Sequence, residues 1–414
     1  MKILIVTPFP PCPGISGGAT AVFNLVKNLS RRHTVICLTF SRVEDLPHLP
    51  ALVPYVAKVI TVPYPGGQGI SILAKLIHLV RRVGQNIISL LTLTPVSVWK
   101  SRRLSMVRAL REVIEQHRPN VVHICFPQMA QYVDYCLGVP TVMDTQDVAV
   151  VSAYRRVQKS CGLLAKGYHF LQWLFWIMHE TIYYRKFDKI LTLTQQDAAA
   201  LRIYNPDLDI YVGAIGVDIP SVTMMQEHRR HLIGFLANFA HPPNIDATLF
   251  FLGDVFPLIQ KEIPGAEFVV AGRTPPAFLR GAAGAGVRFV GYVDDVCHFY
   301  GEVDVVVAPL RFGGGIKIKV LEALACGRPV VATSVGAEGI AGREEGALLI
   351  ADDPSRFAAC VCRLLEDAVL AQKIGVNGRS LVAERFSWER VVNDLEGIYA
   401  RLVSEMKDED SCRP

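Results

Sequence analysis

Three consecutive glycines, followed closely by two lysines and a glutamate, are the residues of this sequence with the clearest chemical potential. The glycines occupy positions 313–315, between a short apolar segment and a segment with helical periodicity. Glycines before a helix allow free backbone N–H groups to approach an anion, and the positive end of the helix dipole favours negative charge there. The pattern therefore predicts an anion-binding loop of a size that suits a pyrophosphate.

Charged side chains follow this loop at helical spacing. Lys317 and Lys319 supply positive charge, and Glu322 lies three residues after Lys319, on the same face of the expected helix. A lysine can bind a phosphate while a neighbouring carboxylate accepts hydrogen bonds from ribose hydroxyls. The alternative is an intrahelical ion pair between Lys319 and Glu322 with no ligand.

A second glycine pair, Gly17-Gly18, lies in a proline-rich loop between the first apolar segment and the first helical segment. The pair permits an anion to approach the start of that helix. It has neither the lysine of a Walker loop nor the spacing of GxGxxG. A tight connection between strand and helix explains the loop equally well.

Short apolar segments alternate with helical patterns along the chain, which predicts an α/β fold with parallel sheets. The strands expected in the first half are residues 2–7, 33–40, 58–62, 120–125, 140–144 and 189–193. Those expected in the second half are residues 232–237, 266–271, 287–290, 303–308, 329–332 and 347–350. We expect two doubly wound domains, residues 1–213 and 214–386, with ligands at the carboxyl ends of their strands. A long amphipathic helix is expected over residues 387–406.

Composition excludes several classes of protein. With 414 residues, 51% hydrophobic and 20% charged, the chain is neither disordered nor collagenous nor a small disulfide-stapled domain. The ten cysteines show no CxxC pair and no zinc spacing, which indicates a reducing cytoplasm and no structural metal ion. No stretch reaches the roughly 18 uncharged apolar residues that a membrane-spanning helix needs.

Charge is distributed unevenly. Residues 1–218 hold 23 Lys and Arg against 13 Asp and Glu, whereas the remainder holds 20 against 25. No acidic residue lies between Asp45 and Glu112, an interval with nine basic ones, so the first half attracts phosphates. The basic segments 70–83 and 97–111 and the aromatic segment 163–184 are typical of helices on an anionic membrane surface, with a solvated face over core aromatics as the equal alternative. No nucleic-acid partner is expected, because no recognition motif accompanies the charge.

From Met1 to about Tyr399 the chain resembles the retaining GT-B glycosyltransferases of the group 1 class, family 4. The resemblance rests chiefly on residues 313–333, with residues 17–18, 213–218, 268–273 and 290–293 in support. It implies two Rossmann-like domains that bind a nucleotide sugar. Residues 1–213 would form the acceptor-side domain, with the C-terminal crossover helix 387–406 packing back on it, and residues 214–386 the donor-binding domain.

The resemblance also implies roles for individual residues. Glu322 would bind the donor ribose. The backbone amides of Gly314, Gly315 and Ile316 would face the diphosphate or the sugar, and Gly17-Gly18 would abut the transferred sugar.

This sequence departs from the family pattern at the donor site. Most members carry a glutamate eight residues before Glu322, where this chain has Gly314. The usual Arg and Lys after the first strand of the second domain are absent from residues 234–244, where Asn238 stands. We expect positive charge from Lys317, Lys319 and Arg273, the last of which follows Gly272, because a diphosphate in a closed site must be neutralised.

Two histidines that are common in the first domain of the family are displaced as well. Cys125 stands at one position and Gln146 at the other. His123 and Asp147 remain near expected strand ends and are the candidate catalytic residues, each equally open to a structural role. Members of this family are thought to react on one face of the sugar with help from the donor phosphate, so no side-chain base is strictly required.

The sequence thus predicts a retaining, metal-independent, hexosyltransferase-type glycosyltransferase. It would move a sugar from a nucleoside-diphosphate donor, used as co-substrate without a further cofactor, to a saccharide or lipid-linked acceptor, as in polysaccharide or glycolipid biosynthesis. A cytoplasmic enzyme on the inner face of a membrane is expected. The alternatives are a nucleotide-sugar epimerase, which needs acid and base groups facing the cleft, and a degenerate GT-B protein that binds a nucleotide sugar without turnover.

Overall fold

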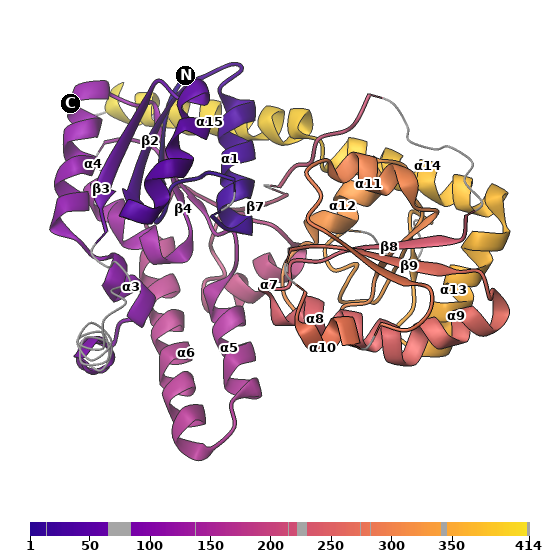
Figure 1. The fold of residues 1–414 in the computed structure, drawn as a ribbon. Helices are drawn as coiled ribbons and strands as arrows, with labels where there is room; N and C mark the ends of the chain where they lie inside the picture. Colours follow the sequence, from indigo (N-terminus) through magenta and orange to yellow (C-terminus); the bar gives the residue numbers. More distant parts are fainter. Residues whose placement is uncertain are drawn as a thin grey trace. The chain divides into compact units, whose positions relative to one another are not determined.

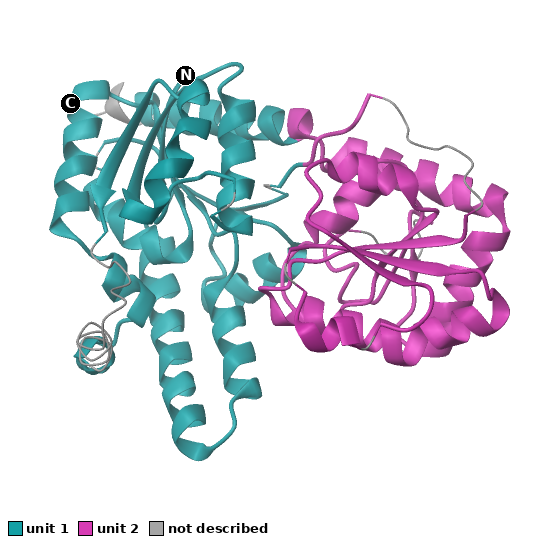
Figure 2. Cartoon of the chain, in the orientation of Figure 1, with its two compact units in different colours: residues 1–216, 391–414 teal, residues 217–390 magenta. Residues whose placement is uncertain are grey.

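The chain folds into two compact units, one for each half of the sequence. The computed structural model describes residues 1–13, 15–64, 84–136, 138–213, 215–221, 230–273, 275–281, 283–340 and 346–411. Unit 1 comprises Met1–Gly216 and Val391–Pro414, and unit 2 comprises Val217–Arg390 (Figure 2). The expected boundaries at 213/214 and 387 lie within a few residues of these limits.

Unit 1 contains a seven-stranded parallel sheet with the order β3-β2-β1-β4-β5-β6-β7. Its strands are β1 (Lys2–Thr7), β2 (Thr34–Ser41), β3 (Lys58–Pro63), β4 (Val121–Cys125), β5 (Thr141–Asp144), β6 (Lys189–Thr192) and β7 (Ile210–Val212). Residues Ile3 to Val6 of β1 are fully buried, as expected for a strand covered by helices on both faces. The strand order reverses between β1 and β4, and this reversal marks where a doubly wound sheet binds ligands.

The helices of unit 1 flank this sheet (Figure 1). They are α1 (Gly17–Leu29), α3 (Val96–Ser101), α4 (Leu104–His117), α5 (Ala149–Lys159), α6 (Leu163–Tyr184), α7 (Gln195–Tyr204) and the 3₁₀ segments Val43–Ala51, Val53–Tyr55 and Pro127–Tyr135. The basic segment 97–111 is helical but divided between α3 and α4, where the Tyr132 hydroxyl donates to Ser101 O at 2.5 Å and accepts from Arg103 N at 3.0 Å. These bonds separate α3 from α4. The basic segment expected over 70–83 lies outside the described residues.

Unit 2 contains a six-stranded parallel sheet with the order β10-β9-β8-β11-β12-β13. Its strands are β8 (Leu232–Leu236), β9 (Glu267–Ala271), β10 (Val287–Gly291), β11 (Val305–Ala308), β12 (Val330–Ala332) and β13 (Leu349–Ile350). All twelve strands expected from the sequence are present within two residues of their predicted ends, and β7 is an addition. Here the strand order reverses between β8 and β11, so the loops after these two strands border the expected ligand site.

The helices of unit 2 are α8 (Pro242–Phe250), α9 (Phe256–Glu262), α10 (Ala277–Gly281), α11 (Val296–Glu302), α12 (Ile318–Ala325), α13 (Pro354–Glu366) and α14 (Ala368–Arg385). The helical segment between β8 and β9 consists of α8, a π-helical turn over Phe251–Val255 and α9. Pro257 explains the interruption, because proline has no N–H to continue the α-helical ladder.

The last helix, α15 (Trp388–Ser411), joins unit 1 from Val391 onward and extends beyond the expected end at residue 406. Leu395, Ile398, Tyr399 and Leu402 form its buried stripe. Its acidic residues also bind unit 1: Glu396 pairs with His33 at 2.8 Å and with Arg32 at 3.1 Å.

A buried polar network anchors α15 to the sheet of unit 1. The Tyr399 hydroxyl oxygen lies 2.6 Å from His123 Nδ1. His123 Nε2 lies 3.4 Å from Asp144 Oδ2, and the Gln146 side-chain amide donates to the same oxygen at 2.7 Å. His123, Asp144 and Tyr399 are fully buried. Each polar group of the network therefore has a partner where water does not reach.

We predict that Tyr399→Phe lowers the free energy of unfolding of unit 1 by about 1–3 kcal/mol, because a buried imidazole nitrogen loses its partner. Urea unfolding followed by circular dichroism measures the change. Tyr154→Phe is the matched control, since this tyrosine on α5 is about half exposed and its change should stay below about 0.5 kcal/mol. Equal midpoints for the two variants would contradict the role of the network.

Candidate functional site

The glycine loop of unit 2 connects β11 to α12 and has the backbone geometry that only glycine adopts easily. Gly313 has a φ of +126° and Gly315 a φ of +71°, a region that side chains with a Cβ disfavour. Gly314 is exposed, and the side chain of Ile316 is buried beneath the loop. The loop thus presents bare backbone immediately before the N-terminus of an eight-residue helix, as an anion site requires.

Lys317 braces this loop. Its Nζ donates to Gly315 O at 2.5 Å and to Gly314 O at 3.3 Å, and it lies 3.5 Å from Glu338 Oε2. The ammonium therefore contributes its charge beside the glycines while it holds their carbonyls in place. The sequence predicts the positive charge of Lys317 but not that its side chain turns back onto the glycine loop.

Lys319 is held by groups from outside its own helix. Its Nζ donates to Asn244 Oδ1 at 2.7 Å and lies 4.5 Å from the centre of the Phe235 ring. Burial lowers the pKa of Lys319 to about 7. The Asn244 amide in turn donates to Asn238 O at 2.8 Å, which ties α12 to α8 and to the loop after β8.

Glu322 lies one turn further along α12. Burial raises the pKa of Glu322 to about 7, and the carboxylate of Asp218 acts in the same direction. Lys319 and Glu322 form no ion pair with each other, since the lysine is turned to Asn244. The ion-pair alternative for these two residues is therefore wrong, and both remain incompletely neutralised groups beside the glycine loop.

The loop after β9 completes this edge of the unit 2 sheet. A Cβ at Gly272 would lie 1.9 Å from Ala237 O, so the loops after β8 and β9 touch only because this residue has no side chain. Gly272 N also donates to Gly291 O at 2.6 Å. Arg273 is exposed, with its guanidinium 3.9 Å above the ring of Tyr292. The structure thus brings all the predicted donor-site residues of unit 2 to the carboxyl ends of β8, β9 and β11 or to α12.

The glycine pair of unit 1 has two distinct roles. Ser16 caps α1 by accepting from Ala19 N at 3.1 Å, and Gly17 opens the helix with free space around its Cα. A Cβ at Gly18 would lie 2.9 Å from the ring of Phe126, a residue that itself has a φ of +73°. Packing against Phe126 thus explains why residue 18 is a glycine. Gly17 has no such contact and leaves the start of α1 accessible.

The two candidate catalytic residues occupy very different places. His123 is inside unit 1 with both ring nitrogens facing Tyr399 and Asp144, which favours the structural alternative for this residue. Asp147 lies in the exposed loop after β5, where its Oδ2 accepts from Ser152 Oγ at 2.5 Å and supports the start of α5. Asp147 therefore lies just after the carboxyl end of β5, where desolvation raises the pKa of its carboxyl group, and its catalytic role stays a prediction.

His123, Cys125 and Asp144 also have potential ligand atoms within 4.8 Å of one another. Burial raises the pKa of the Cys125 thiol well above its usual range, which disfavours the thiolate that a metal ion needs. The His123 Nε2 is engaged with Asp144, and the group belongs to the network that holds α15. We therefore interpret it as a structural cluster.

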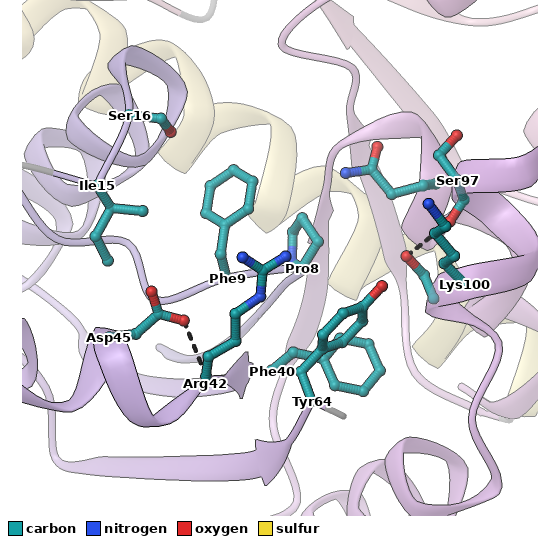
Figure 3. A pocket seen from close by; sticks show the side chains of 12 residues that line it. Pro8, Phe9, Ile15, Ser16, Phe40, Arg42, Asp45, Tyr64, Ser97 and Lys100 are labelled. Carbon is teal, nitrogen blue, oxygen red and sulfur yellow. Dashed lines mark hydrogen bonds between the residues drawn. The ribbon is translucent and has the colours of Figure 1, made fainter. Parts of the chain in front are cut away.

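A pocket of about 340 Å³ lies at the carboxyl ends of β1, β2 and β3 (Figure 3). Arg42 reaches between the rings of Phe9 and Tyr64, with its guanidinium carbon 5.3 Å from the centre of the tyrosine ring. Ser97 and Lys100 of α3 line the pocket from the other side. Sequence analysis missed this site, because its residues come from loops far apart in the chain and carry no shared spacing.

Comparisons with known proteins agree with this architecture. Residues 230–367 match the family described as Glycosyl transferases group 1. The D-inositol 3-phosphate glycosyltransferase of Salinispora tropica is 38% identical over 27% of this chain and 23% of its own length. The phosphatidyl-myo-inositol mannosyltransferase of Mycobacterium tuberculosis is 30% identical over 40% of this chain and 46% of its own length. The chain spans between about a quarter and just over half the length of the first curated relatives it matches.

Solved structures resemble nearly the whole chain. Sucrose-phosphate synthase from Thermosynechococcus elongatus has a TM-score of 0.66 at 17% identity and covers 98% of this chain and 100% of its own. Anabaena HepE in complex with UDP has a TM-score of 0.67 at 12% identity, over 97% and 100%. The glycosyltransferase WaaG has a TM-score of 0.59 at 14% identity, over 95% and 99%. The predicted fold class, two Rossmann-like parallel-sheet domains of the GT-B type, is confirmed.

Proposed function

We propose that this chain is a glycosyltransferase of the group 1 type that transfers a sugar from a nucleoside-diphosphate donor to a saccharide or lipid-linked acceptor. The observation that carries the proposal is the edge of the unit 2 sheet, where a bare glycine loop, a helix N-terminus and the buried Lys319 lie together. The family match over residues 230–367 covers these same residues.

The donor diphosphate would bind over Gly314 and Gly315, where backbone N–H groups and the start of α12 favour an anion. Lys319 favours binding of this diphosphate, because water solvates its ammonium group poorly and an anionic partner would stabilise the charge. Glu322, one turn further on, would accept hydrogen bonds from the donor ribose. In support, the similarly folded HepE has been solved with UDP.

We further propose that the reaction needs no divalent cation and retains the configuration of the sugar. Lys317, Lys319 and Arg273 supply basic groups along one sheet edge, where they would stabilise the charge of a leaving diphosphate. Gly314 replaces a carboxylate at the loop, and His123 is enclosed by Tyr399 and Asp144, so neither of these two positions supplies a nucleophile or base to the sugar. These side chains are consistent with a reaction on one face of the sugar in which the donor phosphate helps to deprotonate the acceptor.

The pocket of unit 1 supports an acceptor that carries a negative charge. Arg42 has donors beyond the one it directs at Glu44, and the Tyr64 ring provides an apolar face for a sugar or cyclitol ring. Ser97 and Lys100 add a hydroxyl and a second cation, and Asp45, which accepts from Arg42 N, is the one acidic residue among the described residues of the lining. The names of two relatives specify phosphorylated inositols as acceptors, which have this combination of ring and charge.

We place this activity in the cytoplasm, at the inner face of a membrane. The buried thiols of Cys37, Cys125 and Cys136 suit a reducing compartment. The positive balance of unit 1 suits a surface of anionic lipids.

The donor assignment predicts that one of UDP, GDP, ADP, CDP or TDP, or a corresponding nucleotide sugar, raises the melting temperature. Glu322→Gln should weaken that nucleotide about tenfold or more, because a charged acceptor is lost. Glu366→Gln, an exposed glutamate at the end of α13, is the control and should bind as the wild type does. Chelation with EDTA should change nothing.

Unchanged affinity in Glu322→Gln would show that the donor binds elsewhere. Turnover separates the alternatives: a degenerate protein would bind the nucleotide sugar without transfer or hydrolysis, and an epimerase would return an altered nucleotide sugar.

The pKa of Lys319 predicts a pH dependence of nucleotide binding. Above pH 7 the free protein loses the ammonium proton, so binding a diphosphate must restore it, and affinity should fall between about pH 7.5 and 9, where the phosphate charge is constant. In Lys319→Arg the guanidinium stays charged and the profile should be flat. Calorimetry in two buffers of different ionisation enthalpy should detect proton uptake by the wild type only. Parallel profiles for both proteins would refute this assignment.

The acceptor pocket predicts that Arg42→Gln weakens binding of an inositol phosphate about tenfold, because a charge-assisted hydrogen bond is lost. Binding of inositol itself, which is weaker, should not change. Saturation-transfer NMR measures both ligands, and Arg31→Gln, an exposed arginine beyond the end of α1, is the control. Equal losses of inositol phosphate affinity in Arg42→Gln and Arg31→Gln would show a general effect of charge and would contradict the assignment of the pocket.

A further inference from the structure

The α5–α6 hairpin of unit 1 projects from the sheet and is not used by the donor site or the pocket. In Figure 1 the two helices run side by side, and the turn that joins them lies at their far end from the strands. The Trp173 ring of α6 packs on Tyr154 of α5, with ring centroids 5.3 Å apart, and on Phe170 of its own helix at 5.5 Å. The hairpin is thus a firm element that presents its tip to the surroundings.

The tip is apolar and exposed. Leu163 and Leu164 are 91% and 93% exposed, more than any other large apolar side chain among the described residues. Further along α6, Leu171, Met178 and Ile182 are also exposed. Single exposed leucines are ordinary on a protein surface. Two adjacent exposed leucines at the end of a projecting hairpin, followed by an apolar stripe, indicate a surface that binds a membrane or another protein.

Basic residues surround this apolar tip. Arg155, Arg156 and Lys159 lie in the last turns of α5, and Lys166 lies in the first turn of α6. A hollow of about 480 Å³ between the helices is lined by these three residues of α5 and by His169. No acidic residue occurs between Asp147 and Glu180. The hairpin therefore combines apolar insertion with an uninterrupted positive charge.

A second exposed apolar segment lies against α6. The Tyr168 hydroxyl donates to Asn86 Oδ1 at 2.8 Å, and the Gln172 amide donates to Ser89 Oγ at 2.9 Å. These bonds hold the segment whose Ile87, Leu91 and Leu93 side chains are exposed. The apolar surface thus extends from the hairpin to its neighbour.

We propose that the hairpin tip, residues 155–166, binds an anionic phospholipid bilayer. Leu163 and Leu164 enter the boundary between headgroups and acyl chains, and the basic residues bind lipid phosphates around them. Among the described residues, no helix is both long and apolar enough to cross a bilayer, so the contact is interfacial. The charge favours lipid over a second copy of this chain, because two copies would bring like charges together.

This inference deepens the proposed function, since the same surface would bring unit 1 to a lipid-linked acceptor. It does not depend on catalysis. The hairpin is separate from the glycine loop and from the unit 1 pocket, so vesicle binding and nucleotide binding can be measured independently on the same variants.

The test is co-sedimentation of the full chain with vesicles of phosphatidylcholine alone or with about 30% phosphatidylglycerol, whose anionic headgroups attract basic residues. The wild type should bind the anionic vesicles, and added salt should weaken the binding. Leu163→Ser with Leu164→Ser should lower the partition coefficient at least about tenfold. Arg156→Gln with Lys159→Gln should lower it about fivefold per charge.

The matched control is Ile203→Ser with Val369→Ser, which removes two apolar side chains that are 74% and 78% exposed elsewhere. This control should bind vesicles as the wild type does. Wild-type chain that stays in the supernatant, or a leucine variant that binds as well as the control, would overturn the proposal.

Analytical ultracentrifugation without lipid tests the alternative that the hairpin tip binds a second copy of this chain. If the wild type self-associates and the leucine variant is monomeric, with no difference between them on vesicles, the tip is an interface between copies and the proposal fails. Retained nucleotide binding in a variant that has lost vesicle binding keeps the two proposals distinguishable.

Discussion

The hydrogen bond from Lys319 to Asn244 is the interaction on which the candidate donor site depends. It holds the partly buried ammonium of Lys319 beside the Phe235 ring, and Asn238 holds the asparagine in turn. Little water remains to solvate this charge, which is why the pKa of Lys319 falls toward neutrality. An anion bound at the loop would compensate the ammonium for the water it has lost. The desolvation cost of Lys319 would therefore favour binding of a diphosphate.

Unit 1 uses its polar residues in two separate ways. Inside, His123, Asp144 and Tyr399 satisfy one another and attach α15, so none of them is available to a ligand. At the surface, Arg42 and the basic residues of the α5–α6 hairpin remain accessible and positively charged. Buried polar groups must be paired to be tolerated, whereas charges at the surface attract anions from solution.

The candidate site could be predicted in part. Glycines 313 and 315 were identified by type and position, because only glycine accepts their backbone angles, and Glu322 by its helical spacing from Lys319. Asn244 was missed, since an asparagine three residues into a helix has no sequence signal for a partner on α12. His123 illustrates the reverse case: its place on β4 was expected, but its enclosure by α15 came from a residue 276 positions away.

The alternation of strands and helices, the two sheets and the glycine loop before α12 could be predicted from the sequence, because apolar periodicity and glycine are local properties of a chain. Tertiary structure decided which charged groups lose their water and which partners they meet. It turned Lys317 onto its own loop, assembled Arg42 and Tyr64 into a pocket, and left Leu163 and Leu164 exposed at the end of a hairpin. These outcomes depend on distances between residues that are remote in sequence, and no local pattern encodes such distances.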